Sequence, residues 1–185
     1  MSDLYAGEPF YALRVRSNFE KTVVAHLTGR GYSPFLPAYK TKRMWSDRMR
    51  EIEQPLFPGY VFCRFPIESR LPVISVPGLI MIVGAGRCPL PVDEHEIAEV
   101  RHVLEAGWPM EPWKFLESGD QVVIDQGALR GVGGIMVSTR GECRLILSVT
   151  LLQRSVAVEI DRDWVRPAVA LSAERLWRQA SSPGS

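Results

Sequence analysis

The sequence lacks most of what enzymes and secreted proteins use for their chemistry. Its three cysteines, Cys63, Cys88 and Cys143, are widely spaced and form no C-x-x-C pair, so we expect neither a disulfide framework nor a zinc site. The histidines lie at no metal-ligand spacing, and the chain has no G-x-S-x-G turn or phosphate-binding loop. No stretch approaches the roughly 18 apolar residues of a membrane span, and the N-terminus lacks the layout of a signal peptide. We therefore expect a cytoplasmic protein that is not an enzyme and that holds no metal or cofactor.

An excess of charge of one sign is absent from the whole chain but present locally. The 185 residues contain 22 Lys and Arg against 21 Asp and Glu, a net charge of +1 that argues against a strongly basic nucleic-acid binder. Residues 10–50, however, hold nine basic and two acidic side chains, whereas residues 51–107 hold four basic and eight acidic ones. The hydrophobic fraction of 46% is ordinary for one globular domain or two small ones.

Two amphipathic helices are expected in the first part of the chain. Residues 11–16 alternate apolar and polar side chains with the strand period of two. Residues 17–20 (Ser-Asn-Phe-Glu) have the pattern of a capping box that opens a helix, which Gly31 then ends. A second helix begins after Asp93 as N-cap, with Glu96 reaching back to the cap, and ends before residue 108.

The remaining segments of this part predict strands. Residues 32–39 predict an extended edge strand, and residues 40–54 predict a mobile hairpin or loop. Residues 55–65 and 78–83 are strongly β-prone and predict strands central to one sheet. Strands interleaved with helices indicate an α+β sandwich.

The pattern of apolar residues, prolines and glycines changes after residue 107. Residues 108–117 contain two prolines and no apolar period, which is typical of a linker. Residues 118–168 predict four or five short strands cut by glycines, and a small β-barrel is the economical arrangement of such strands. Residues 169–185 predict a tail that is partly disordered. The expected fold is α+β: an N-terminal sandwich of residues 9–107, a linker and a C-terminal barrel.

An aromatic turn is the least ordinary feature of the first domain. Residues 56–62 read Leu-Phe-Pro-Gly-Tyr-Val-Phe, and aromatic side chains beside a Pro-Gly turn are expected to be partly exposed. Phe57 and Tyr60 would then anchor a protein partner. The alternative is that both simply cap the core of the sheet.

Basic side chains with an aromatic residue among them form a second candidate site. Two arginines on one strand face, followed by a basic loop around Trp45, could track a phosphate backbone and stack a base. The alternative is an ordinary solvated loop, because the same loop carries acidic residues. The basic candidates are Arg14, Arg16, Lys40, Lys42, Arg43, Arg48 and Arg50.

A glycine-rich turn marks the second domain. Residues 119–135 place their glycines where a tight turn between two barrel strands needs them. The residues that define this turn are Gly127, Leu129, Gly131, Val132 and Gly134.

Taken together, these motifs resemble the NusG family of transcription elongation factors. Phe10 and Tyr11 resemble its opening Trp-Tyr pair, residues 56–61 resemble its most characteristic run, and residues 119–135 resemble its KOW motif. The resemblance covers residues 9–168. Residues 145–160 are most similar to specialised paralogues of the UpxY and RfaH kind.

The resemblance implies an NGN domain that binds the β′ clamp helices of RNA polymerase through an apolar cavity. A monomer would thereby promote processive elongation and antitermination, on specific long operons in the specialised paralogues, and touch the non-template DNA strand weakly. The DNA-facing positions of those paralogues match Arg16 and His26 here. The polymerase-binding positions match Phe10, Tyr11, Phe57, Pro58, Gly59, Tyr60 and Phe62.

Further partners in the family are the β subunit and, through the KOW domain, termination factor Rho or a ribosomal protein. The His-Thr-Thr motif that contacts the β subunit falls here on residues 69–71 (Ser-Arg-Leu). An aromatic residue of the KOW turn is replaced by Val132. Because KOW barrels also occur in ribosomal proteins, an RNA-binding or ribosome-associated module without a polymerase role is the alternative function.

Overall fold

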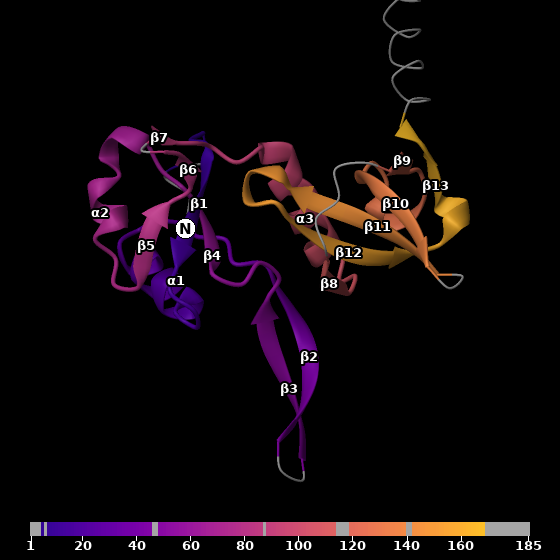
Figure 1. The fold of residues 1–185 in the computed structure, drawn as a ribbon, viewed down its shortest axis with the longest axis horizontal. Coiled ribbons are helices and arrows are strands. Elements are labelled where there is room, and N and C mark those ends of the chain that lie inside the picture. Colours follow the sequence, from indigo (N-terminus) through magenta and orange to yellow (C-terminus); the bar gives the residue numbers. More distant parts are fainter. Residues whose placement is uncertain are drawn as a thin grey trace, which may run out of the picture. The chain divides into compact units, whose positions relative to one another are not determined.

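A computed structural model describes residues 5, 7–45, 48–86, 88–113, 119–139 and 142–168 of the chain. The chain divides into two compact units (Figure 1). Unit 1 comprises Met1–Ala98 together with Val149–Arg154, and unit 2 comprises Glu99–Ser148 and Ser155–Ser185. None of the described helices combines the length and the apolar character needed to cross a membrane.

Unit 1 is built around a three-stranded antiparallel sheet with the order β4-β1-β5. Strand β1 (Phe10–Val15) lies between β4 (Tyr60–Arg64) and β5 (Leu79–Ile82). The prediction that residues 55–65 and 78–83 form strands central to one sheet is wrong as to their position, because in the described part of the chain β4 and β5 flank the central strand β1. The pairing of β1 with β5 shifts register between Arg14 and Val15. On β5, Ile80 is 55% exposed.

Two helices, α1 (Glu20–Gly29) and α2 (Leu71–Ile74), lie on one side of this sheet (Figure 1). Val23, Leu27 and Val73 bury their side chains in the core cluster there. Helix α1 ends as expected, with Gly31 in the left-handed region at φ +86°. The predicted capping box at its start is wrong. The N-cap position is Phe19, whose side chain has no hydrogen-bonding atom, and the Glu20 carboxylate accepts a hydrogen bond from Gly59 N.

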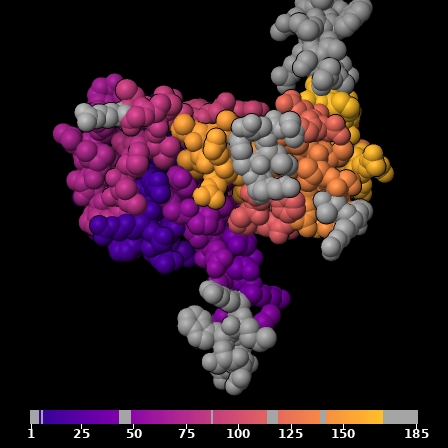
Figure 2. Space-filling view, viewed as in Figure 1, coloured from indigo at the N-terminus to yellow at the C-terminus, as the bar shows by residue number. Residues whose placement is uncertain are grey.

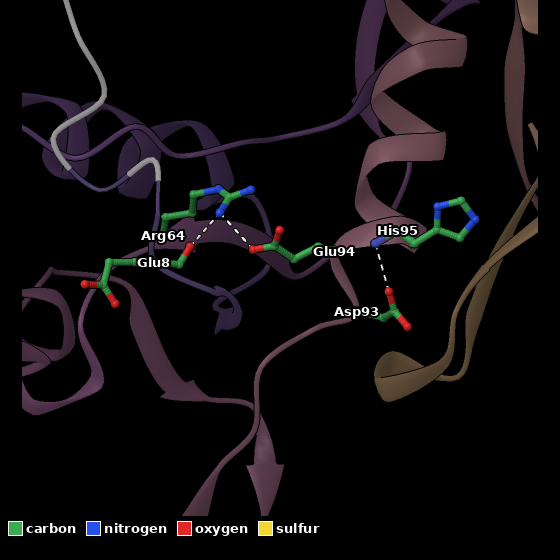
Figure 3. Close-up of polar contacts among 5 residues, drawn as sticks. All are labelled: Glu8, Arg64, Asp93, Glu94 and His95. Carbon is green, nitrogen blue, oxygen red and sulfur yellow. Dashed lines mark hydrogen bonds and ion pairs between the residues drawn. The ribbon is translucent and has the colours of Figure 1, made fainter. Parts of the chain in front are cut away.

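Helix α3 (Glu94–Glu105) follows the predicted start in one respect and not in another. Asp93 is confirmed as its cap, because Asp93 Oδ1 accepts a hydrogen bond of 2.8 Å from His95 N (Figure 3). Glu96 does not reach back to the cap. Its carboxylate instead accepts hydrogen bonds from Thr150 N and Thr150 Oγ1, donors that the local sequence does not contain.

A long hairpin projects from unit 1 (Figures 1 and 2). Its strands are β2 (Ala38–Trp45) and β3 (Arg48–Pro55), eight residues each and paired over their whole length. The loop alternative for residues 40–54 is therefore wrong, and of the predicted edge strand at 32–39 only an isolated bridge from Phe35 and the start of β2 exist. A short antiparallel pair, β6 (Gly84–Ala85) and β7 (Cys88–Pro89), also lies in this unit.

Unit 2 centres on a six-stranded sheet with the order β13-β9-β10-β11-β12-β8. The expected α+β class, with an all-β C-terminal part, is confirmed. The range 108–117, expected to be a linker, contains β8, which pairs antiparallel with β12. The tail predicted for residues 169–185 lies outside the described residues. The strands are β8 (Met110–Trp113), β9 (Asp120–Ile124), β10 (Gly133–Thr139), β11 (Glu142–Val149), β12 (Arg154–Ile160) and β13 (Val165–Pro167).

Candidate functional site

The sheet of unit 1 has two chemically different faces. Successive side chains of a strand point to opposite faces, and Leu13 and Val15 of β1 belong to the core cluster that α1 and α2 complete. The alternate residues of β1 belong to the other face, which we call the outer face. Because residues directly opposite each other on neighbouring strands share a face, the register of β1 and β4 defines it. Its pairs are Phe10–Arg64, Ala12–Phe62 and Arg14–Tyr60.

An aromatic cluster forms the floor of the outer face. The ring of Phe62 lies 5.7 Å from that of Phe57, edge to face, and 6.3 Å from that of Phe35, measured between centroids. Phe57 and Phe62 are fully buried, so the expectation that Phe57 is partly exposed is wrong. Pro58 is exposed and Tyr60 is partly exposed. The turn thus leaves Pro58 and Tyr60 accessible beside a packed aromatic cluster.

Hydrogen bonds at both ends of the Gly59 residue hold the turn. Gly59 N donates to Glu20 Oε1 at 2.8 Å, and Gly59 O accepts from Val15 N at 2.8 Å. Gly59 has φ +85°, a conformation that costs a side-chain-bearing residue about 1–2 kcal/mol. Tyr60 N donates to Phe57 O at 3.1 Å and closes the turn. The buried Glu20 carboxylate, which the sequence placed in a helix cap, therefore supports the aromatic turn.

Arg64 ties three segments together at one end of the outer face (Figure 3). Its guanidinium donates to Glu8 O at 2.6 Å and to Glu94 Oε1 at 2.8 Å, and it lies 4.2 Å from the centroid of the Phe10 ring. The side chain is only 17% exposed. Sequence reasoning missed Arg64, because its partners lie far along the chain. These contacts explain why Phe10, a predicted polymerase-binding residue, is buried.

Tyr11 does not lie with the other predicted polymerase-binding residues. It is buried on the helix-covered face of the sheet, where its ring lies 5.0 Å from that of Phe65. Burial, with the nearby carboxylates of Glu68 and Glu8, raises the pKa of Tyr11. Tyr11 is thus part of the core that positions β1.

The basic candidates are spread over separate places. Arg14 is exposed on the outer face beside Tyr60, and Arg16 is exposed just beyond the end of β1. His26 is exposed on α1, which packs against the opposite face of the sheet. The structure therefore does not place Arg14 and His26 on one face.

The base of the hairpin is nearly neutral. Lys40 Nζ lies 3.7 Å from Glu51 Oε1, and the register sets Lys42 directly opposite Glu51. Glu53 is opposite Lys40 and lies 2.9 Å from Lys21 Nζ. These pairs are exposed, so each contributes little to stability, but they cancel positive charge at this end.

The tip half of the hairpin has a different composition. The register pairs Arg43 with Arg50 and Trp45 with Arg48. Three arginine positions and a tryptophan position are thus concentrated in the half of the hairpin farther from the sheet.

The glycine-rich turn of unit 2 is closed and well packed. Gly127 and Gly131 have φ +68° and +94°, and Gly131 N donates to a β9 carbonyl at 2.7 Å. A Cβ on Gly134 would lie 2.5 Å from a backbone oxygen of β11. Leu129 and Val132 are buried. These predicted turn residues therefore serve the core and backbone of unit 2.

The C-terminal half of α3 belongs to unit 2 and binds the main chain of this same turn. Glu99 Oε1 accepts a hydrogen bond from Gly133 N at 2.7 Å, and His102 Nε2 lies 2.8 Å from Ala128 O. No sequence signal pointed to these contacts. Among the described residues, no cluster of three or more His, Cys, Asp or Glu side chains is placed to hold a metal ion.

Comparisons with known proteins converge on one family. Residues 8–101 match the family model described as "Transcription termination factor nusG". A protein of Thermus thermophilus named "Transcription termination/antitermination protein NusG" is 28% identical over 167 residues, which cover 80% of this chain and 88% of the relative. A protein of the same name from Lactococcus lactis is 26% identical over 164 residues, 85% of each chain.

A solved structure shares the fold. It is described as "Domain interaction in Thermotoga maritima NusG", and it aligns with a TM-score of 0.53 at 21% identity. The alignment covers 87% of this chain and 97% of the other.

Proposed function

Because the chain belongs to the NusG family of transcription termination and antitermination factors, we propose that it binds RNA polymerase through the outer face of unit 1. The partner on the polymerase is the pair of β′ clamp helices, and bound protein promotes processive elongation and antitermination of specific long operons. It acts by binding and carries out no chemistry of its own. The observation that carries the proposal is the partly exposed Tyr60 on a hydrogen-bonded turn above buried aromatic rings.

Tyr60 has the features of an interface anchor. Tyrosine, tryptophan and arginine dominate the binding energy of protein interfaces, and they do so best where neighbouring groups exclude water. Exposed Pro58 stands beside Tyr60, and Glu20 fixes the backbone between them through Gly59. A side chain that is already held loses little conformational entropy when a helix docks on it.

The polymerase test compares the intact protein with the Tyr60→Ala variant on purified bacterial core RNA polymerase. We expect Tyr60→Ala to weaken binding about tenfold or more, because truncation of an interface anchor costs that much. Ile74→Ala is the matched control. Ile74 is 42% exposed on α2, which packs on the opposite side of the sheet, and it lies outside residues 69–71, so this variant should bind like the parent protein. Equal binding by all three proteins would contradict the proposal.

Phe57→Ala is a poor probe of the same interface. The Phe57 side chain is 1% exposed, and emptying such a site costs about 3–5 kcal/mol of stability. A loss of binding by that variant would report a loosened domain. Tyr60, in contrast, can be shortened with less effect on the core.

The same proposal includes a weak contact between the hairpin and the non-template DNA strand. Eight-residue strands carry the tip roughly 25 Å from the base of the hairpin. Lys40 and Lys42 face glutamates, so we assign the contact to the tip half with Arg43, Arg48 and Arg50. Phosphates would be attracted to the arginine positions concentrated there. Arg16 and His26 complete the set as outlying contacts.

The DNA contact is tested on elongation complexes with an exposed non-template strand. Arg50→Gln should lower the yield of protein–DNA cross-links more than the matched variant Lys40→Gln. Equal losses of cross-linking in the two variants would mean that DNA binding depends only on the total charge of the hairpin, and this would contradict the assignment to the tip half. Because the net charge of the chain is +1, duplex DNA alone should bind poorly even at low salt.

A partner of the KOW turn, such as Rho or a ribosomal protein, would meet few apolar groups there. Val132 is buried, whereas Ala128, Arg130 and Gly131 are exposed. Any such partner would therefore contact the Arg130 side chain and the adjoining backbone. Binding of Rho or of a ribosomal protein that survives Arg130→Ala would contradict this assignment.

A further inference from the structure

A row of three residues crosses the outer face in register. Arg14 on the central strand β1 lies directly opposite Tyr60 of β4 on one side and Met81 of β5 on the other. Arg14 is exposed, Tyr60 is partly exposed, and Met81 is 39% exposed. A cation thus stands in the middle of an accessible and largely apolar strip, which we call the Arg14 row.

The two arginines of the outer face, Arg14 and Arg64, differ in the contacts that their guanidinium groups make. Arg64 lies over the Phe10 ring and binds Glu94 and Glu8 O, so its charge is already matched. The Arg14 guanidinium forms no hydrogen bond or ion pair within the part of the chain that the structure describes. The donors of Arg14 are therefore available to a partner that docks on the row.

A docking partner must supply an acceptor for this guanidinium. Removing an arginine from water without a counter-charge is costly, whereas a carboxylate meets its fork of N–H donors with two parallel hydrogen bonds. The Met81 side chain and the Tyr60 ring on either side of Arg14 suit the aliphatic surface of a protein helix. A hydrated phosphate backbone would leave them in contact with charge and water.

We propose that Arg14 sets the charge specificity of the polymerase-binding face by pairing with a carboxylate on the docked helix. The inference rests on the proposed function, and it deepens it, because it states which chemistry the partner must present opposite the Arg14 row. It also separates Arg14 from the DNA-binding set, in which the sequence alone had placed it.

The experiment measures affinity for core RNA polymerase that carries no nucleic acid. Arg14→Glu should weaken binding about tenfold or more, since a close like-charge contact replaces an ion pair. Arg14→Lys should retain more affinity than Arg14→Gln, although it loses the two-pronged geometry. Arg16→Glu is the matched control on this nucleic-acid-free polymerase, because Arg16 is also exposed but lies beyond the row. Circular dichroism should be unchanged in all four, as neither side chain is buried.

A charge-reversal rescue identifies the partner group. Acidic residues of the clamp helices are replaced by lysine one at a time, and one replacement should restore the binding of Arg14→Glu while weakening that of the parent protein. Failure of every acidic position to rescue would overturn the inference.

Three outcomes distinguish the possible failures. If Tyr60→Ala weakens binding but Arg14→Glu does not, the Arg14 inference is wrong and the polymerase-binding face stands. If neither weakens binding, the proposed function itself fails. If Arg14→Glu weakens binding only when a non-template strand is exposed, Arg14 binds phosphate, which also overturns the inference.

Discussion

Replacing Glu20 by alanine should loosen the aromatic turn, and the size of the effect follows from its contacts. The Glu20 side chain is buried and accepts a 2.8 Å hydrogen bond from Gly59 N. Without it, a partly buried N–H group loses its acceptor, which costs about 1–3 kcal/mol. Glu20→Gln keeps an oxygen in place and exchanges a charged acceptor for a neutral one. We expect it to cost about 1 kcal/mol, the difference between a typical hydrogen bond to a charged group and one between neutral groups.

Hydrogen exchange of the Gly59 amide in the intact protein is the direct assay. A local loss of this size should speed exchange of that amide by roughly ten- to a hundredfold in Glu20→Ala. Glu20→Gln should show an intermediate rate. Polymerase affinity should fall in the same order, because Tyr60 is then held less firmly. Glu105→Ala, which removes an exposed carboxylate of α3, is the control and should change neither quantity.

The opposite pattern would refute this reasoning. If Glu20 acted mainly as a helix cap, its removal would speed exchange at the start of α1, where Val23 N donates to Phe19 O. The Gly59 amide would then keep its protection. Unchanged exchange at Gly59 in Glu20→Ala would show that the carboxylate does not support the turn.

Three further predictions concern stability. Gly134→Ala should lower the melting temperature of the intact protein, since its Cβ would lie 2.5 Å from a backbone oxygen and the resulting strain costs about 1–3 kcal/mol. Arg64→Ala should destabilise unit 1 more than Glu94→Ala does, as followed by urea unfolding, because only the first change also removes the contact with Phe10. Burial raises the pKa of Tyr11 and of Tyr32, so both hold their protons more tightly when folded. The stabilisation that these protonated tyrosines give the folded state is complete below their unfolded pKa of about 10 and is lost as the pH rises through the raised values. The melting temperature should therefore be level between pH 8 and 9. Above pH 10 it should fall more steeply than in the Tyr11→Phe, Tyr32→Phe double variant.

The features that the sequence predicts correctly are those with local causes. Asp93 caps α3 through a backbone N–H two residues away, and Gly31 ends α1 because only a residue that tolerates positive φ fits there. The glutamates of the two expected capping boxes had the correct spacing but different partners. Glu20 binds Gly59 and Glu96 binds Thr150, 39 and 54 residues away. A local pattern cannot show that a distant N–H group needs the same carboxylate.

In the candidate site, too, features with a local sequence signal are predictable and features set by distant contacts are not. Residues 56–62 are recognisable as an aromatic turn, but which rings are buried depends on contacts that form only in the folded chain. Phe57 is buried against the Phe62 ring, whereas Tyr60 stays partly exposed. The apolar run of β5 predicts a central strand, yet its place at the edge of the sheet exposes Ile80. Arg64 could not be predicted, because its partners become neighbours only in the folded chain.

Site-specific photo-cross-linking tests the central claim most directly. A photoreactive phenylalanine derivative is placed at position 60, and at position 71 as the control, and each protein is bound to RNA polymerase before illumination. The account predicts that position 60 cross-links to the β′ clamp helices and that position 71 does not. Cross-links to β′ from position 71 but not from position 60 would contradict it.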